Sequence, residues 1–192
     1  MTEETAIEMF VGGLLLDPHT QAPVVVLKDE ADNVHLPIWI GIAEATSIAS
    51  AIKQLNMTRP LTHDLMNDVF VELGVRVERV VITELKESTY FAELILAYGD
   101  KVMILDSRPS DAIAIALRAS APIFVSQTVL DKARVVFSSG EGAPGGKPEG
   151  HIEDSGGTIN PTDEGQDFKS IDKDKWKDIL GALDPDDFKY KM

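Results

Sequence analysis

The chain has 192 residues, 44% of them hydrophobic, so it can fill a core of ordinary size, and its lack of cysteine excludes disulfides and thiolate metal sites. Eighteen basic residues against 32 acidic ones give a formal net charge of −14, which disfavours nucleic-acid binding through a generally basic surface. No apolar run approaches the roughly 18 residues of a membrane span, and the acidic N-terminus does not resemble a secretory signal. We therefore expect a cytoplasmic protein without a membrane segment.

The first part of the chain reads as strands joined by turns. Strand-like apolar runs lie at 6–16, 22–29 and 33–41, and the turn-rich sequences DPHTQ and DEADN separate them. We expect these three runs to form a meander.

Two segments with helical spacing come next. Residues 43–55 place Ile48, Ile52 and Leu55 on one face. Residues 61–74 carry a second apolar face, made of Leu65, Met66, Val69, Phe70 and Leu73. The sequence therefore predicts two helices in succession.

The remainder of this half returns to strands. Further strand-like runs lie at 75–85, 89–98, 101–106 and 121–126. Gly99-Asp100 is a hairpin signal between the second and third of them. Residues 112–120 fit a strand or a buried helix by periodicity, and the preceding Pro-Ser-Asp favours the helix.

This order of elements predicts an α+β fold of two layers, with mixed, mostly antiparallel sheets packed against helices. The strand-before-helix order of 37–52 and 102–117 also hints at a duplicated strand–helix unit. Residues 138–169 are rich in Gly, Pro and acidic residues, which predicts a flexible linker between a domain at 1–137 and a tail at 170–192.

The tail has the pattern of a short amphipathic helix. Trp176, Ile179, Leu180 and Leu183 follow helical spacing, but a helix of this length is marginal alone in water. We expect it to dock on its own domain or on a protein partner.

Two similar motifs stand at predicted helix starts: RPLTHD at 59–64 and RPSD at 108–111. Thr62 and Ser110 are suited to cap the helices, while Asp64 and Asp111 suit the positive end of the helix dipole. Capping does not explain the arginines, and two explanations stay open. In the first explanation, Arg59 and Arg108 pair with acidic neighbours and tie the helix starts together; the candidate partners are Asp64, Asp111 and Glu44. In the second, the arginines hold a phosphate while the carboxylates bind a metal or activate water.

The segments LPIWIGIAEATSIASAI, RPLTHDLMNDVF, DSRPSDAIAIALR and APIFV, in this order, resemble the bifunctional nuclease family of bacteria and plants. The resemblance covers roughly residues 7–136, and KDILGALDPDDFKYKM is similar to a tail of some members. It implies an α+β fold, a homo-oligomer, most simply a dimer, and hydrolysis of phosphodiester bonds in DNA and RNA.

The resemblance also supplies candidate site residues, whose chemistry can be matched to phosphodiester hydrolysis. The candidates for acid–base catalysis are His63, Asp64, Asp111 and Glu44. The candidates for phosphate binding are Arg59, Arg108, Thr62 and Ser110. Asp64, Asp106 and Asp111 are candidate ligands of Mg or Mn, although their spacing is not diagnostic of a metal.

Two other classes of function remain open at this point. The chain could be a non-catalytic, dimeric regulatory or interaction module in which the charged motifs are structural, or a domain that binds a small ligand. The acidic net charge favours the interaction module, and the assembled motifs favour the nuclease. The arrangement of the polar residues, in an open cleft or mutually paired, discriminates between them.

Overall fold

The computed structural model describes residues 5–55 and 57–136, so the predicted linker and tail lie outside the described residues. The strands are β1 (Ala6–Leu16), β2 (Pro23–Lys28), β3 (Val34–Trp39), β4 (Val75–Lys86), β5 (Thr89–Tyr98), β6 (Lys101–Ser107), β7 (Ile123–Ser126) and β8 (Val135–Val136). The helices are α1 (Ile42–Ile52), α2 (Thr62–Glu72), α3 (Pro109–Ala119) and α4 (Gln127–Ala133). The predicted α+β fold is confirmed.

Within the described residues the strands form one mixed sheet in the order β6-β5-β4-β7-β1-β2-β3-β8. The predicted meander of β1, β2 and β3 is confirmed, and β4 to β5 is the longest antiparallel pairing. Strand β7 lies between β4 and β1 and runs parallel to β4, with Val80 opposite Ile123. Strand β7 therefore joins the two halves of the sheet.

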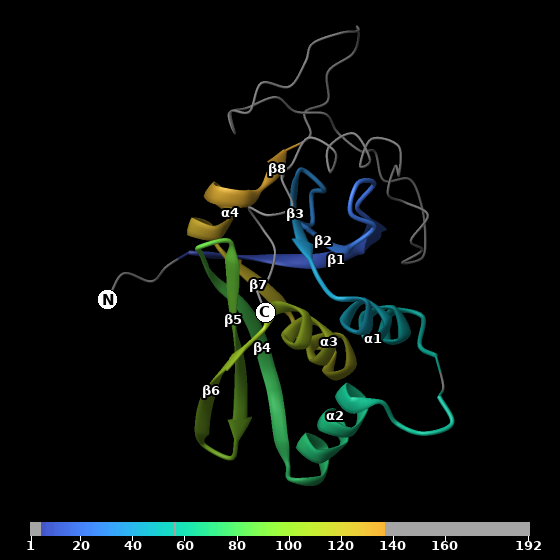
Figure 1. Ribbon diagram of the computed structural model, residues 1–192. Helices are drawn as coiled ribbons and strands as arrows, with labels where there is room; N and C mark the ends of the chain where they lie inside the picture. The colour runs from blue at the N-terminus through green and yellow to red at the C-terminus, as the bar shows by residue number, and fades with distance from the viewer. Residues whose placement is uncertain (1–4, 56, 137–192) are drawn as a thin grey trace, which may run out of the picture.

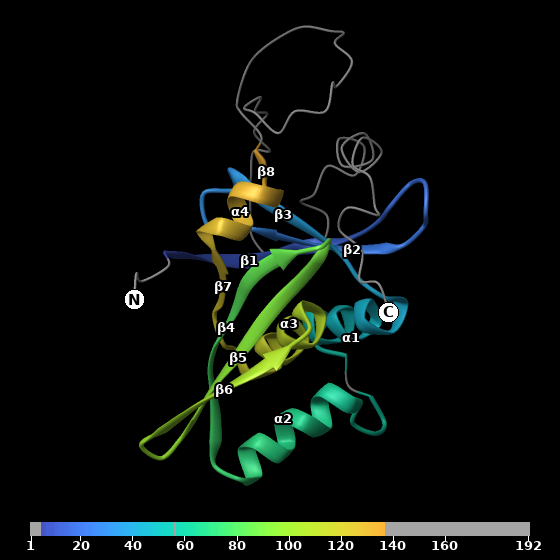
Figure 2. The ribbon, with the colours of Figure 1, turned by 60° about the vertical axis from the view of Figure 1, so that its left-hand side comes forward.

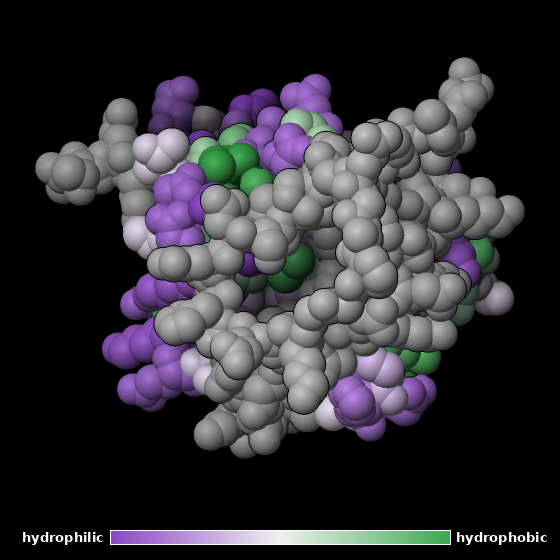
Figure 3. Space-filling view, turned by 90° about the horizontal axis from the view of Figure 1, so that it is seen from above, coloured by the Kyte–Doolittle hydropathy of each residue, from purple (hydrophilic) through white to green (hydrophobic). Residues whose placement is uncertain are grey.

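Helices α1, α2 and α3 lie together on one side of the ribbon formed by β4, β5 and β6 (Figures 1 and 2). The core between the layers includes Ile38, Ile48, Ile82 and Ile113, which are fully buried. No helix in the described ranges combines the length and apolarity needed to cross a membrane. Seen from above, the coloured surface is mostly hydrophilic, with small hydrophobic areas (Figure 3).

Of the apolar face predicted for α2, only Phe70 packs against the core, and it is only partly buried. None of the residues of α2 is buried, and Leu65, Met66 and Val69 are 40–55% exposed. Helix α3 is covered on both sides, because α1 and α2 pack on it while β4 and β5 contact it from the sheet. It therefore offers no apolar face to a second copy, and the homo-oligomer stays a prediction.

Two local features differ from or refine the prediction. Helix α4 was not predicted; Ser126 is its N-cap and accepts a hydrogen bond from the N–H of Val129 at 3.4 Å. The hairpin between β5 and β6 is confirmed, and Gly99 adopts a φ of 55°, which favours glycine. The hint of a duplicated unit gains no support, since β3 lies inside the sheet and β6 at its edge.

Candidate functional site

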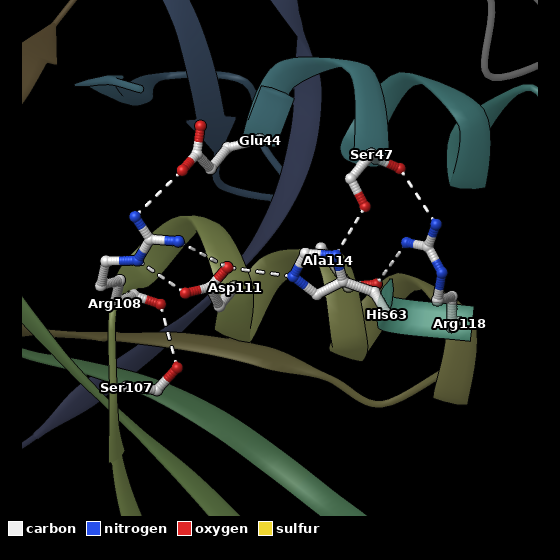
Figure 4. Close-up of polar contacts among 8 residues, drawn as sticks. All are labelled: Glu44, Ser47, His63, Ser107, Arg108, Asp111, Ala114 and Arg118. Carbon is white, nitrogen blue, oxygen red and sulfur yellow. Dashed lines mark hydrogen bonds and ion pairs between the residues drawn. The ribbon is translucent and has the colours of Figure 1, made fainter. Parts of the chain in front are cut away.

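The first turns of three helices meet at one place, and each contributes charged or polar side chains (Figure 4). Helix α1 provides Glu44, and α2 provides His63 and Asp64. Arg108 is the N-cap of α3, and Asp111 lies in the first turn of that helix. Pro109 at the first position of α3 fixes a helical φ and lacks an N–H that would have no partner there. The two sequence motifs and Glu44 are therefore brought together, as both explanations require.

Arg108 joins two carboxylates from different helices. Its Nε and Nη2 donate to Asp111 Oδ2 and Oδ1 at 2.7 and 3.1 Å, and its Nη1 lies 2.9 Å from Glu44 Oε1. The hydrogen bond to Asp111, supported by Glu44, raises the pKa of Arg108 further. The Arg108 side chain is nevertheless 46% exposed, so part of it is accessible to solvent.

Asp111 continues the network to His63 and Ser47. His63 Nε2 lies 3.0 Å from Asp111 Oδ1, and Ser47 Oγ lies 2.8 Å from His63 Nδ1. The hydrogen bond from His63, followed by the contacts with Arg108, lowers the pKa of Asp111 to about 2 despite partial burial. With Asp111 ionised, Nε2–H donates to the carboxylate and Nδ1 accepts the Ser47 proton. Both nitrogens of the ring are thus hydrogen-bonded inside the protein.

Arg118 holds the beginning of α2 against the other helices. Its Nε donates to Asp64, and its other nitrogens donate to the carbonyl oxygens of Ala114 and Ser47 and to Ser50 Oγ at 2.9 to 3.3 Å. Asp64 also accepts from its own helix start, the N–H of Leu61, at 2.8 Å. Burial would raise the pKa of Asp64, but these hydrogen bonds hold it below its usual value.

Sequence reasoning missed Arg118, Ser47 and Ser50. A signal for Arg118 was present, because it lies seven residues after Asp111 and therefore on the same face of α3. Ser47 likewise lies one turn after Glu44 on α1. Short hydroxyl residues in an apolar helix gave no separate indication of a partner.

Four of the candidate residues lie outside this network. Arg59 is exposed in the connection before α2, and within the described residues no ion pair joins it to a carboxylate. Asp106 is exposed on β6, opposite Glu93. Thr62 and Ser110 are not N-caps, because Leu61 and Arg108 occupy those positions, and Ser110 is only 3% exposed. The capping prediction for both residues is wrong.

The candidate metal ligands do not gather. Across residues 5–55 and 57–136, no group of three or more His, Asp or Glu side chains has the arrangement to hold a metal ion. Asp64 is bound to Arg118, Asp111 to Arg108 and His63, and Asp106 is on another element. The donor set of the described residues therefore does not fit a metal site as it stands.

The bifunctional nuclease domain matches residues 25–138 of the chain. An uncharacterized protein of Mycobacterium tuberculosis is 34% identical over 182 residues, which cover 95% of this chain and 98% of that protein. Bifunctional nuclease 2 of Arabidopsis thaliana is 31% identical over 132 residues, which cover 66% of this chain but only 40% of that protein. Bifunctional nuclease 1 of the same plant is 30% identical over 147 residues, which cover 72% of this chain and 44% of that protein. The matched region contains all three helix starts of the polar network, and the chain belongs to the bifunctional nuclease domain family.

Proposed function

We propose that this protein is a nuclease that hydrolyses phosphodiester bonds of DNA and RNA. The observation that carries the proposal is the half-exposed side chain of Arg108, held where the N-terminal turns of α1, α2 and α3 meet, beside the Asp111–His63 pair. Helix N-termini carry partial positive charge, and a guanidinium binds two phosphate oxygens at once. These donors act at short range only, because the chain carries a net charge of −14 and Glu44 and Asp111 lie beside the guanidinium.

Arg108 would bind the nonbridging oxygens of the scissile phosphate. A phosphate competes with Asp111 and Glu44 for the guanidinium, so its binding loosens the contacts of Arg108 at 2.7 and 2.9 Å. Neutralising the charge on these oxygens is a main requirement of phosphodiester hydrolysis.

His63 would accept the proton of the attacking water. Asp111 is bound to both Arg108 and His63. When phosphate displaces Asp111 from Arg108, the carboxylate also moves away from His63, which leaves Nε2 open to a water molecule. Ser47 Oγ can accept from Nδ1–H as readily as it donates to Nδ1, so Ser47 supports the tautomer in which Nε2 is the base. Glu44 would continue to orient Arg108, and the leaving oxygen would take its proton from solvent as the P–O bond breaks.

A requirement for Mg²⁺ or Mn²⁺ stays a prediction, and the roles of Arg108 and His63 do not depend on it. The requirement is checked by comparing cleavage in the presence of either ion with cleavage after chelation. The proposal also includes a cytoplasmic location, a homo-oligomer, and a protein partner for the tail helix as an alternative to docking on its own domain.

The decisive experiment is Arg108→Ala with single-stranded DNA and RNA as substrates. We expect cleavage of both to fall at least about 100-fold, because one preorganised donor to the reacting phosphate has effects of this size. The variant should fold, since the side chain is 46% exposed and such ion pairs contribute little to stability. Lys101→Ala, which removes an exposed cation of β6 outside the network, is the matched control.

One observation favours a second candidate, the non-catalytic interaction module. Asp111 uses both oxygens and His63 both nitrogens within the protein, as a purely structural network would. Wild-type protein freed of contaminating nucleases that cleaves neither substrate, with Mg²⁺, with Mn²⁺ or without metal, would replace the nuclease by this module.

A further inference from the structure

Arg118, in the last turn of α3, is the most deeply buried cation of the polar network. Its side chain is 7% exposed, against 46% for Arg108, so it lies too deep to contact a substrate phosphate. Its hydrogen bonds reach acceptors on three helices, namely Asp64 on α2, Ser47 and Ser50 on α1, and Ala114 on α3 itself. Any effect of Arg118 on a reaction at Arg108 must therefore pass through these residues.

Two of these contacts lie on either side of His63 (Figure 4). Asp64 directly follows His63 in α2, and it accepts a hydrogen bond from Nε of Arg118. Ser47, whose Oγ lies 2.8 Å from Nδ1 of His63, accepts at its carbonyl oxygen from Nη2 of Arg118 at 3.3 Å. Arg118 therefore fixes both the residue next to His63 in the chain and the residue whose hydroxyl contacts its ring.

Little else in the described residues fixes the first turn of α2. Phe70 is the one apolar side chain of α2 packed against the core, and it lies two turns further along the helix. Both oxygens of Asp64 are engaged, since Oδ1 accepts from Arg118 and Oδ2 from the N–H of Leu61. The place of the His63 ring therefore depends on the contact between Asp64 and Arg118.

We propose that Arg118 is a positioning residue, which through Asp64 and Ser47 holds the His63 ring where Nε2 can take the proton of the attacking water. The inference rests on the proposed function, because it concerns the base of that reaction. Asp64 then shares the positioning role and is neither an acid–base catalyst nor a metal ligand. The role matters for rate, since a displacement of about 1 Å can slow a positioned reaction about 100-fold.

The shape of the guanidinium suits an arginine to this role. Its planar fork donates in several fixed directions, and Arg118 directs them to acceptors on α1, α2 and α3. A lysine would keep a positive charge beside Asp64 but would present one nitrogen in place of three. The variant Arg118→Lys therefore separates positioning from simple charge pairing.

The first test is steady-state cleavage of single-stranded DNA by the full chain carrying Arg118→Lys, at a temperature where circular dichroism shows an intact fold. We expect kcat to fall at least about tenfold and KM to change less than about twofold, because Arg118 acts on the base and not on the phosphate. Arg134→Lys makes the same change at an exposed arginine outside the network, and it should keep the wild-type kcat. An unchanged kcat, or a loss confined to KM, would overturn the inference.

Nuclear magnetic resonance of the His63 ring gives a second measurement that does not depend on cleavage. Nε2–H donates to Asp111 in the wild type, so its proton should be protected from exchange with water. In Arg118→Lys and in Asp64→Asn we expect this proton to exchange at least about tenfold faster, while the amides of β4 and β5 exchange as in the wild type.

Unchanged protection of this proton in both variants would contradict the inference, even if cleavage falls. If the wild type cleaves no nucleic acid but both variants lose the protection, the nuclease proposal fails, and Arg118 still positions His63.

Discussion

Helices α2 and α3 have the same length, 11 residues, and both follow an Arg-Pro motif, yet the fold treats them in opposite ways. Seven residues of α3 are buried, whereas α2 has none. The alanines of α3 allow close packing on β4 and β5 on one side and on α1 and α2 on the other. Similar motifs at a helix start therefore do not determine how deeply the helix is embedded.

This difference divides the polar network into a firmly held part and a weakly held part. Arg108, Asp111 and Arg118 all belong to the buried α3, whereas His63 and Asp64 come from α2. Because Phe70, which is only partly buried, is the one apolar side chain of α2 packed against the core, the polar contacts of α2 with α3 carry an unusual share of its attachment. The proposed catalytic base is thus held in place by the network in which it would act.

The largest expected effect comes from truncating an apolar residue in each helix. Ile113→Ala in α3 should lower the free energy of unfolding by about 2 to 5 kcal/mol, because Ile113 is fully buried and leaves a cavity. Leu65→Ala in α2 should cost less than about 1 kcal/mol, since Leu65 is 55% exposed. Urea unfolding measures both values. A cost for Leu65→Ala equal to that for Ile113→Ala would mean that α2 is covered in solution.

A smaller loss is expected for Arg118→Ala. Arg118 is 7% exposed and donates to groups on all three helices, so its removal leaves Asp64 and the carbonyl oxygen of Ser47 without these donors. We expect a loss of about 2 to 3 kcal/mol in unfolding free energy, together with faster hydrogen exchange throughout α2. Arg134→Ala, which removes an exposed arginine, is the control. Unchanged exchange in α2 would show that apolar contacts hold this helix.

The same contrast explains what could be predicted from sequence. Apolar patterns predicted β1 to β7 and helices α1 and α2, and the Pro-Ser-Asp sequence favoured a helix for α3, because these signals depend on residues close in sequence. The exposure of α2 could not be predicted in this way, since its pattern of Leu65, Met66 and Val69 is that of an ordinary core helix. For the site, the motifs predicted Arg108, Asp111 and Glu44 as partners. The contact of Asp64 with Arg118, 54 residues apart, depends on the tertiary fold.

Acid should weaken the network in a defined pH range. The folded-state pKa of Asp111 is about 2, below its unfolded value, so its stabilising contribution is complete above about pH 4 and is lost as the pH falls through 2. The shift corresponds to about 2 kcal/mol. Asp111→Asn should remove this contribution, so the difference in unfolding free energy between wild type and variant should shrink from pH 5 to pH 2. A difference that is constant over this range would contradict the assignment.

The smallest effect on stability, with a clear effect on function, is expected for Gly41→Ala. Gly41 precedes α1 with a φ of −76°, which alanine also adopts, so the backbone should tolerate the change within about 0.5 kcal/mol. A Cβ at this position would lie 2.2 Å from Glu44 Oε2, however, and must displace that carboxylate from Arg108. If Glu44 orients Arg108 for phosphate, cleavage should fall by about tenfold, as expected for loss of one contact in a positioned site. The double variant with Glu44→Ala decides the cause: it should be no less active than Glu44→Ala alone. Additive losses would show that Gly41 acts on cleavage by another route.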